Sequence, residues 1–232
     1  MNSKLLLFGL QRSGTNYTST LIEENYPEVE ICNGAERSLP THKHFRLYGR
    51  PEFNPDQKYY HNFQYPDFGA YEEHVARITQ GQKFQYLIVT KEPLTWYISV
   101  LKEAKKSRWK TLNRKGFNHH YLIDYNLFCR HWLQFKAEAP DRIYHLRYED
   151  LLADLNGSLT KVSEFFGWKP VDGEIRNPSK VYKSKSFSRA RKAFYKSPNL
   201  HEFFSASDLL AARAHLEPAV LEGLGYSLPE QV

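Results

Sequence analysis

Short apolar runs alternate with helix-like segments along this 232-residue chain. Residues 4–10 form a short β-type run that ends in a glycine turn, and residues 84–90 form a continuous apolar run, which is typical of a strand buried on both faces of a parallel sheet. Residues 28–32 and the first part of 141–152 predict two further strands. Because helical patterns separate the strands, the sequence predicts an α/β fold in three layers around a central, mainly parallel sheet.

Helical periodicity marks the segments between the strands. A helix is expected over 15–24, and another begins near Pro93, where the missing N–H of proline costs little. Residues 121–138 carry aromatic side chains three or four positions apart, which predicts an amphipathic helix. A further helix is expected to end at Gly167, and one last helix to span 206–226.

Residues 46–80 contain prolines, glycines and many aromatics without a sustained period, so an irregular excursion is expected there. No repeat or linker interrupts the remaining pattern, and we expect a single domain over 1–232. A composition of 41% hydrophobic and 15% aromatic residues excludes an intrinsically disordered chain. The formal net charge of +6 favours an anionic ligand or an anionic surface.

The two cysteines, Cys32 and Cys129, stand far apart and form neither a disulfide framework nor a metal cluster, which favours a reducing compartment. The first residues do not resemble a signal peptide, because Gly, Gln and Arg interrupt a short apolar run. No stretch approaches the ~18 to 20 apolar residues of a membrane span. The sequence therefore predicts a cytoplasmic protein without a transmembrane segment.

The segment 11–17, "QRSGTNY", forms a turn between the first predicted strand and helix. Such a turn presents unpaired backbone N–H groups at the positive end of the helix dipole, a geometry that binds phosphate or sulfate. Gly14 allows the backbone to approach an anion closely, and Arg12 adds a fixed charge. The neighbouring side chains add hydroxyl and amide donors: Ser13, Thr15 and Asn16.

The pattern of a nucleotide triphosphatase loop is only half present. Gly9 and Gly14 have the right separation, but Thr15–Asn16 stands where Lys–Ser/Thr would bind the β/γ-phosphates and magnesium. The segment 11–17 instead resembles the 5′-phosphosulfate-binding loop of the sulfotransferases. The resemblance implies a fold related to P-loop NTPases, 3′-phosphoadenosine 5′-phosphosulfate (PAPS) as the donor, adenosine 3′,5′-bisphosphate (PAP) as the product, no metal, and donor contacts from Arg12 to Tyr17.

A second motif of this family is an arginine followed, after seven residues, by a serine, both of which bind the 3′-phosphate. Lys91 and Ser99 have this spacing, with lysine in place of arginine. Lysine keeps the charge but loses the bidentate geometry. Lys91 ends a predicted strand, and ligands of open α/β sheets gather at such strand ends. A third segment, Tyr148–Glu149–Asp150, is similar to a Tyr-Glu-Asp-Leu segment of the family, and we interpret it as structural.

Residues 180–196 contain seven Lys or Arg and no acidic residue. A solvated loop or a nucleic-acid patch is the usual interpretation of such a run. The resemblance implies instead a cover over the donor, and no nucleic-acid partner. The segment lacks the usual Arg-Lys-Gly signature, so Lys183, Lys185, Arg189, Arg191 and Lys192 all stay candidates for the 3′-phosphate, with Arg189 and Arg191 favoured.

The segment "LPTHKHF" (39–45) offers a general base, because histidine titrates near neutral pH. The pair Lys43–His44 resembles a Lys-His pair of several bacterial members, so His44 is the first candidate and Lys43 is expected to steady the transferring sulfonate. His42 is the second candidate and Glu36 the third. A metal bound by His42 and His44 lacks a third ligand at a sensible spacing.

These motifs occur in family order, and the sequence predicts a PAPS-dependent sulfotransferase of bacterial type. The acceptor is a small molecule or a glycan, with a glycan hydroxyl favoured over phenols, lipids and peptides, and Arg12 is expected to stabilise the departing bisphosphate. Two rival hypotheses stay open: a P-loop kinase acting on a small molecule, and a basic nucleic-acid-binding module. The oligomeric state is open as well.

Overall fold

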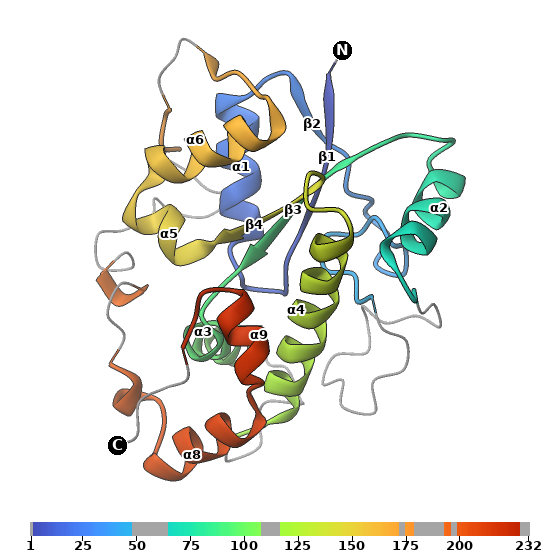
Figure 1. Ribbon diagram of the computed structural model, residues 1–232. Coiled ribbons are helices and arrows are strands. Elements are labelled where there is room, and N and C mark those ends of the chain that lie inside the picture. The colour runs from blue at the N-terminus through green and yellow to red at the C-terminus, as the bar shows by residue number, and fades with distance from the viewer. Residues whose placement is uncertain are drawn as a thin grey trace.

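The computed structural model describes residues 2–47, 65–107, 117–171, 175–178, 193–195 and 199–227. Within these ranges four parallel strands form one sheet in the order β2-β1-β3-β4 (Figure 1). The strands are β1 (Ser3–Phe8), β2 (Val29–Ile31), β3 (Gln85–Thr90) and β4 (Ile143–Arg147). Three strands lie within the segments that predict them and β1 begins one residue before its predicted run of 4–10, so the predicted parallel sheet is confirmed.

Alternate residues of the strands point into two separate hydrophobic cores. Leu5 and Leu7 of β1 face one core, while Leu6 and Phe8 face the other, and all four are almost completely buried. A strand buried on both faces needs apolar residues at every position, which is why its sequence shows no alternation.

Helices cover both faces of the sheet and complete three layers (Figure 1). One face packs against α1 (Thr15–Asn25), α5 (Tyr148–Ala153) and α6 (Leu155–Phe166). The other face packs against α2 (Phe68–Ile78), α3 (Pro93–Ser107), α4 (His120–Glu138), α8 (Ala206–His215) and α9 (Pro218–Gly223). A short 3-10 helix, η4 (Leu200–Glu202), precedes α8. The α/β class predicted from the sequence is thus confirmed.

The amphipathic helix expected over 121–138 is α4, and its predicted aromatic face is its buried face. All five aromatic side chains of that face are at most 4% exposed: Tyr121, Tyr125, Phe128, Trp132 and Phe135. Among the described residues no helix is both long and apolar enough to cross a bilayer.

The prediction of a single last helix over 206–226 is wrong, because the chain leaves the helical region between α8 and α9. Leu216 and Glu217 have extended backbone, with ψ angles of 133° and 116°. Pro218 follows at the first position of α9. Proline disfavours helical backbone in the residue before it and offers no N–H to continue a helix, so the chain starts a new one.

The irregular excursion expected over 46–80 is also wrong in part, because α2 occupies its second half. The side chain of Asp67 accepts a hydrogen bond from the Ala70 N–H and caps the helix. Phe68, Tyr71 and Val75, at helical spacing, pack into the core. Residues 48–64 of the predicted excursion lie outside the described residues.

Candidate active site

The β1–α1 loop has the backbone of a tight turn with two residues in the left-handed region. Arg12 has φ 71° and Gly14 has φ 110°. The Ser13 N–H donates to the Leu10 carbonyl at 3.1 Å, and the Trp96 indole N–H of α3 donates to the Gln11 carbonyl at 2.7 Å. Hydrogen bonds from within the loop and from the neighbouring helix therefore hold it in place.

Gly14 is required by its backbone angle and by its surroundings. A Cβ atom at this position would collide with the ring of Tyr148, the first residue after β4. Thr18 N–H donates to the Gly14 carbonyl at 3.1 Å as α1 begins. The backbone at Gly14 thus sits against an aromatic ring and leads directly into a helix N-terminus, where N–H groups lack intrahelical partners.

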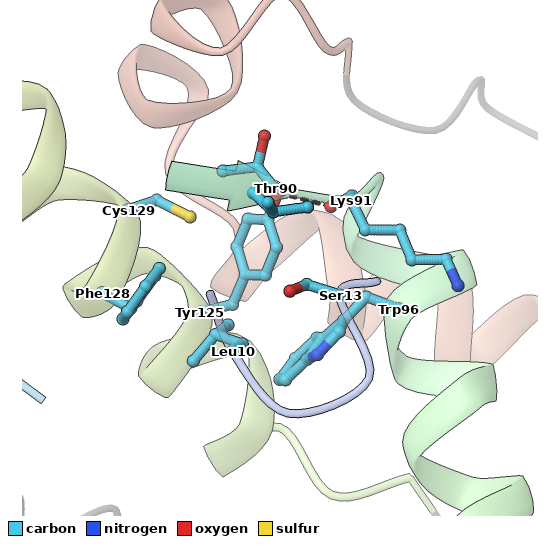
Figure 2. Close-up of a pocket in the computed structure, with 9 residues that line it drawn as sticks. Leu10, Ser13, Thr90, Lys91, Trp96, Tyr125, Phe128 and Cys129 are labelled. Carbon is cyan, nitrogen blue, oxygen red and sulfur yellow. Dashed lines mark hydrogen bonds between the residues drawn. The ribbon is translucent and has the colours of Figure 1, made fainter. Parts of the chain in front are cut away.

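The predicted donor-binding side chains of this loop point in different directions. Arg12 is 43% exposed and pairs with Glu103 of α3 at 3.4 Å between Nη1 and Oε2. The Ser13 hydroxyl is buried and has no hydrogen-bond partner in the described part of the chain. Figure 2 shows it turned into a pocket under the loop, together with Leu10, Trp96 and Tyr125 among others. An anion above this loop therefore meets its backbone and Arg12 rather than the Ser13 hydroxyl.

Three further loop residues were predicted to contact the donor. Thr15 is buried, and Asn16 is exposed at the start of α1. Tyr17 is buried, and its hydroxyl donates to the Asn177 side chain at 2.9 Å. The Tyr17 ring also meets the Tyr148 ring edge-on at 6.4 Å. The Tyr17 side chain therefore supports the loop from the core side.

The candidate base segment is docked directly on this loop. The Gly9 N–H donates to the Lys43 carbonyl at 3.0 Å, and His44 Nδ1 lies 2.8 Å from the Gly9 carbonyl oxygen. Lys43 Nζ donates to the Asn16 side-chain oxygen at 2.6 Å. Because a carbonyl only accepts, His44 Nδ1 carries the proton, and in the neutral ring the lone pair lies on Nε2. The structure thus brings Lys43 and His44 to the predicted anion site.

His42 and His44 form an edge-to-face pair with ring centres 5.6 Å apart. Burial lowers the pKa of His44 to about 3, with the nearby cations of Arg46 and Lys43 acting in the same direction. Burial and the charge of Lys43 lower the pKa of His42 to about 4. Both rings are therefore neutral at pH 7 and can accept a proton, but their pKa values lie well below the near-neutral titration expected from the sequence, so each is a weaker base than an ordinary histidine. His42 Nδ1 is engaged, since it accepts the His44 backbone N–H at 3.1 Å.

A buried ion pair that the sequence analysis missed fixes the backbone beside His44. Arg46 and Asp124 of α4 are each only 4% exposed, and they form two hydrogen bonds of 3.1 and 3.0 Å. Arg46 Nη1 also donates to the His44 carbonyl at 2.6 Å. The guanidinium therefore links α4 to the candidate base.

The structure also brings Lys91 and Ser99 together. Lys91 Nζ donates to Ser99 Oγ at 2.9 Å, and the two residues are 2% and 4% exposed. Two aromatic rings flank the ammonium group, that of Tyr148 with its centre at 4.8 Å and that of Tyr195 at 3.5 Å. The Glu92 carboxylate accepts N–H groups of the first turn of α3, from Leu94 and Thr95, and so fixes where this helix starts.

The segment Tyr148–Glu149–Asp150 begins α5 and joins several elements. One Glu149 oxygen accepts the Glu92 N–H at 3.0 Å, and the other accepts the Tyr226 hydroxyl at 2.9 Å. Glu149 therefore ties the end of β4 to the end of β3 and to the C-terminal region. The favoured cover residues Arg189 and Arg191, with Lys183, Lys185 and Lys192, lie outside the described residues.

The neutral histidines predict a loss of stability in acid. Burial lowers the pKa of His145, a half-buried residue of β4, to about 3, like that of His44. Between pH 6.5 and the lowered values the unfolded chain binds protons that the fold excludes, so the free energy of unfolding falls as pH falls. Each such group contributes a slope of up to about 1.4 kcal/mol per pH unit. Urea unfolding between pH 7 and about pH 5 measures this slope, and His145→Gln is expected to flatten it; equal slopes in both chains would contradict the assignment.

This α/β architecture, with a glycine-containing turn between its first strand and helix and a basic residue after a neighbouring strand, is that of a P-loop-like fold. The family model of the sulfotransferase domain matches residues 2–205, and the chain belongs to the sulfotransferase family. It is a transferase that moves sulfuryl groups. A comparison with curated proteins finds no match. The described residues contain no group of three side chains suited to hold a metal ion.

Proposed function

We propose that the chain transfers the sulfuryl group of PAPS to an acceptor hydroxyl, with a glycan as the favoured acceptor, and releases PAP. One observation carries the proposal. The β1–α1 loop and the Lys91/Ser99 pair follow β1 and β3, which are neighbours in the parallel sheet, so both anion sites lie at the same edge. Two such sites suit a nucleotide that carries anionic groups on both its 5′ and 3′ positions.

In this proposal the 5′-phosphosulfate lies on the β1–α1 loop, where the backbone N–H groups of Gly14, Thr15 and Asn16 and the Arg12 guanidinium face it, since the N–H groups of Ser13 and Tyr17 donate to carbonyls within the loop. The 3′-phosphate binds Lys91 and Ser99, with Arg189 and Arg191 of the basic stretch as further ligands. No metal is needed, since Thr15–Asn16 replaces the Lys–Ser/Thr pair of a triphosphatase loop. The Asn16 side chain is instead bound to Lys43.

The transfer step uses residues that the structure places beside this loop. The acceptor oxygen attacks sulfur in line, the bond from sulfur to the bridging phosphate oxygen breaks, and a new oxygen–sulfur bond forms. The acceptor proton passes to His44 Nε2, the nitrogen left unprotonated by the bond of Nδ1 to Gly9. Lys43 steadies the sulfonate, and Arg12 stabilises the charge on the departing phosphate. His42, whose Nδ1 is already engaged, is the second candidate base.

A thermal-shift comparison tests the donor. Because PAP binds only the folded chain, saturating PAP is expected to raise Tm, with about 2.7 kcal/mol of stabilisation at a concentration of 100 Kd. ATP with magnesium is expected to give a smaller shift. A shift with ATP and magnesium but not with PAP would contradict the proposal and favour a P-loop kinase.

Two arginine variants locate the binding. Arg12→Ala is expected to remove most of the PAP shift, while Arg130→Ala keeps it. Arg130 is a matched control because it also forms an exposed ion pair, with Glu217 at 3.1 Å. Exposed pairs contribute about 0 to 1 kcal/mol, so both variants fold like the wild type. An equal PAP shift in the two variants would remove Arg12 from the site.

A further inference from the structure

The Lys91/Ser99 pair is covered by a side chain of the chain itself. Tyr195 places its ring centre 3.5 Å from Lys91 Nζ, and its hydroxyl lies 3.0 Å from Ser99 Oγ. Its ring also meets the Tyr148 ring edge-on at 5.5 Å. With Lys91 only 2% exposed, no open face of the ammonium group is left for a ligand.

The hydrogen bonds of the Ser99 hydroxyl also occupy every position that a ligand could use. Its hydroxyl donates to the Thr95 carbonyl at 2.9 Å and accepts from Lys91 Nζ at 2.9 Å. Since its only proton is used, the Tyr195 hydroxyl is the donor in the third contact. A serine hydroxyl has one proton and two lone pairs, so all three positions are occupied. A phosphate oxygen, which only accepts, meets no available donor at Ser99 in this arrangement.

Among the side chains described around Lys91, that of Tyr195 is the easiest to displace. Tyr148 is 5% exposed and wedged against Gly14, while Ser99 is buried within α3. Tyr195 is half-buried at the end of the helical turn 193–195. The preceding residue, Phe194, holds this turn on α3, where Lys102 Nζ lies 4.1 Å from its ring centre. The tyrosine side chain is therefore displaced at lower cost than its neighbours.

We propose that Tyr195 determines the nucleotide selectivity of the donor site, because its side chain occupies the place beside Lys91 and Ser99 that the 3′-phosphate needs and has to leave when that phosphate binds. This inference rests on the proposed function, which assigns the 3′-phosphate to Lys91 and Ser99. Displacing the ring breaks a cation–π contact and a hydrogen bond, and this cost lowers the affinity only for nucleotides with a 3′-phosphate.

Calorimetric titrations with PAP and with AMP, which lacks the 3′-phosphate, test the proposal. Tyr195→Ala is expected to lower the Kd of PAP by about tenfold and to leave the Kd of AMP unchanged. Tyr195→Phe keeps the ring, and its Kd for PAP is expected to fall by about two- to threefold. Tyr144→Ala is the matched control, since it removes another half-buried tyrosine, one that lies in β4 and packs on Phe165 of α6.

Weaker PAP binding by Tyr195→Ala would make Tyr195 a ligand of the nucleotide, and unchanged binding would show that Tyr195 has no effect on it. Either result would overturn the proposal. A parallel change for AMP would overturn it too, because the effect would not depend on the 3′-phosphate. If Tyr195→Ala fails to fold, Tyr195→Phe decides by the same criteria. Failure of both the wild type and Tyr195→Ala to bind PAP would contradict the PAPS donor, and this inference with it.

Discussion

Replacing His44 by alanine is expected to lower kcat by about 10²- to 10⁴-fold, the usual contribution of a general base, while the Kd of PAP stays within about twofold of the wild type. In the proposed mechanism Nε2 takes the acceptor proton, because Nδ1 carries the proton that it donates to the Gly9 carbonyl, and burial keeps the ring neutral at pH 7. Because the proposed mechanism has His44 act on the acceptor, its loss is expected to affect turnover rather than donor binding. Steady-state kinetics with PAPS and calorimetry with PAP measure the two effects.

His131→Ala is the matched control for this variant. His131 Nδ1 also lies near a backbone carbonyl, that of Leu127 at 2.7 Å, and burial lowers its pKa as well, but it belongs to α4 outside the site. This variant is expected to keep the wild-type kcat. A His44→Ala chain with normal turnover would exclude His44 as the base, and the same assay on His42→Ala would then test the second candidate.

Replacing Asp124 by alanine is expected to lower the free energy of unfolding by about 3 to 5 kcal/mol, a large part of the stability of a typical domain. The substitution leaves the Arg46 guanidinium, 4% exposed, as a buried cation without its carboxylate. Arg46 also holds the His44 carbonyl, so kcat is expected to fall along with stability. Urea unfolding of the full chain gives the first effect, and kinetics at low temperature give the second.

Two comparisons separate a buried charge from a merely lost contact. The double variant with Arg46→Met and Asp124→Ala removes both charges and is expected to regain most of the lost stability. Glu217→Ala breaks the exposed pair with Arg130 and is expected to cost at most about 1 kcal/mol. A single Asp124→Ala variant as stable as Glu217→Ala would show that the buried pair contributes no more than a surface contact.

The sequence predicts the sheet well because its strands are buried on both faces. Continuous apolar runs such as 84–90 have few other structural solutions, and β3 lies within that run. The helices are less well predicted where a proline interrupts a periodic pattern or where glycine and aromatic residues obscure one. Pro218 starts α9, so that α8 ends inside a segment whose apolar spacing looks continuous. α2 forms within a segment whose glycine and aromatic residues obscure its apolar spacing.

The candidate site shows the same difference: its local motifs can be predicted from the sequence, and its long-range contacts cannot. The loop around Gly14 and the Lys91/Ser99 spacing are local patterns, and the structure places both at the carboxyl ends of neighbouring strands. The pairing of Arg46 with Asp124 joins residues 78 positions apart, and the contact of Tyr195 with Ser99 joins residues 96 apart. No periodicity or motif encodes such pairs, since they follow from how α4 and the turn 193–195 pack in three dimensions.

Gly9 holds the two candidate residues Lys43 and His44 through the backbone of a single residue. Its N–H holds Lys43, its carbonyl holds His44, and a Cβ there would lie 2.7 Å from the Val89 carbonyl oxygen of β3. The distance from the β1–α1 loop to the imidazole is therefore set by backbone at the centre of the sheet. A side chain at this position would therefore displace both Lys43 and His44 at once.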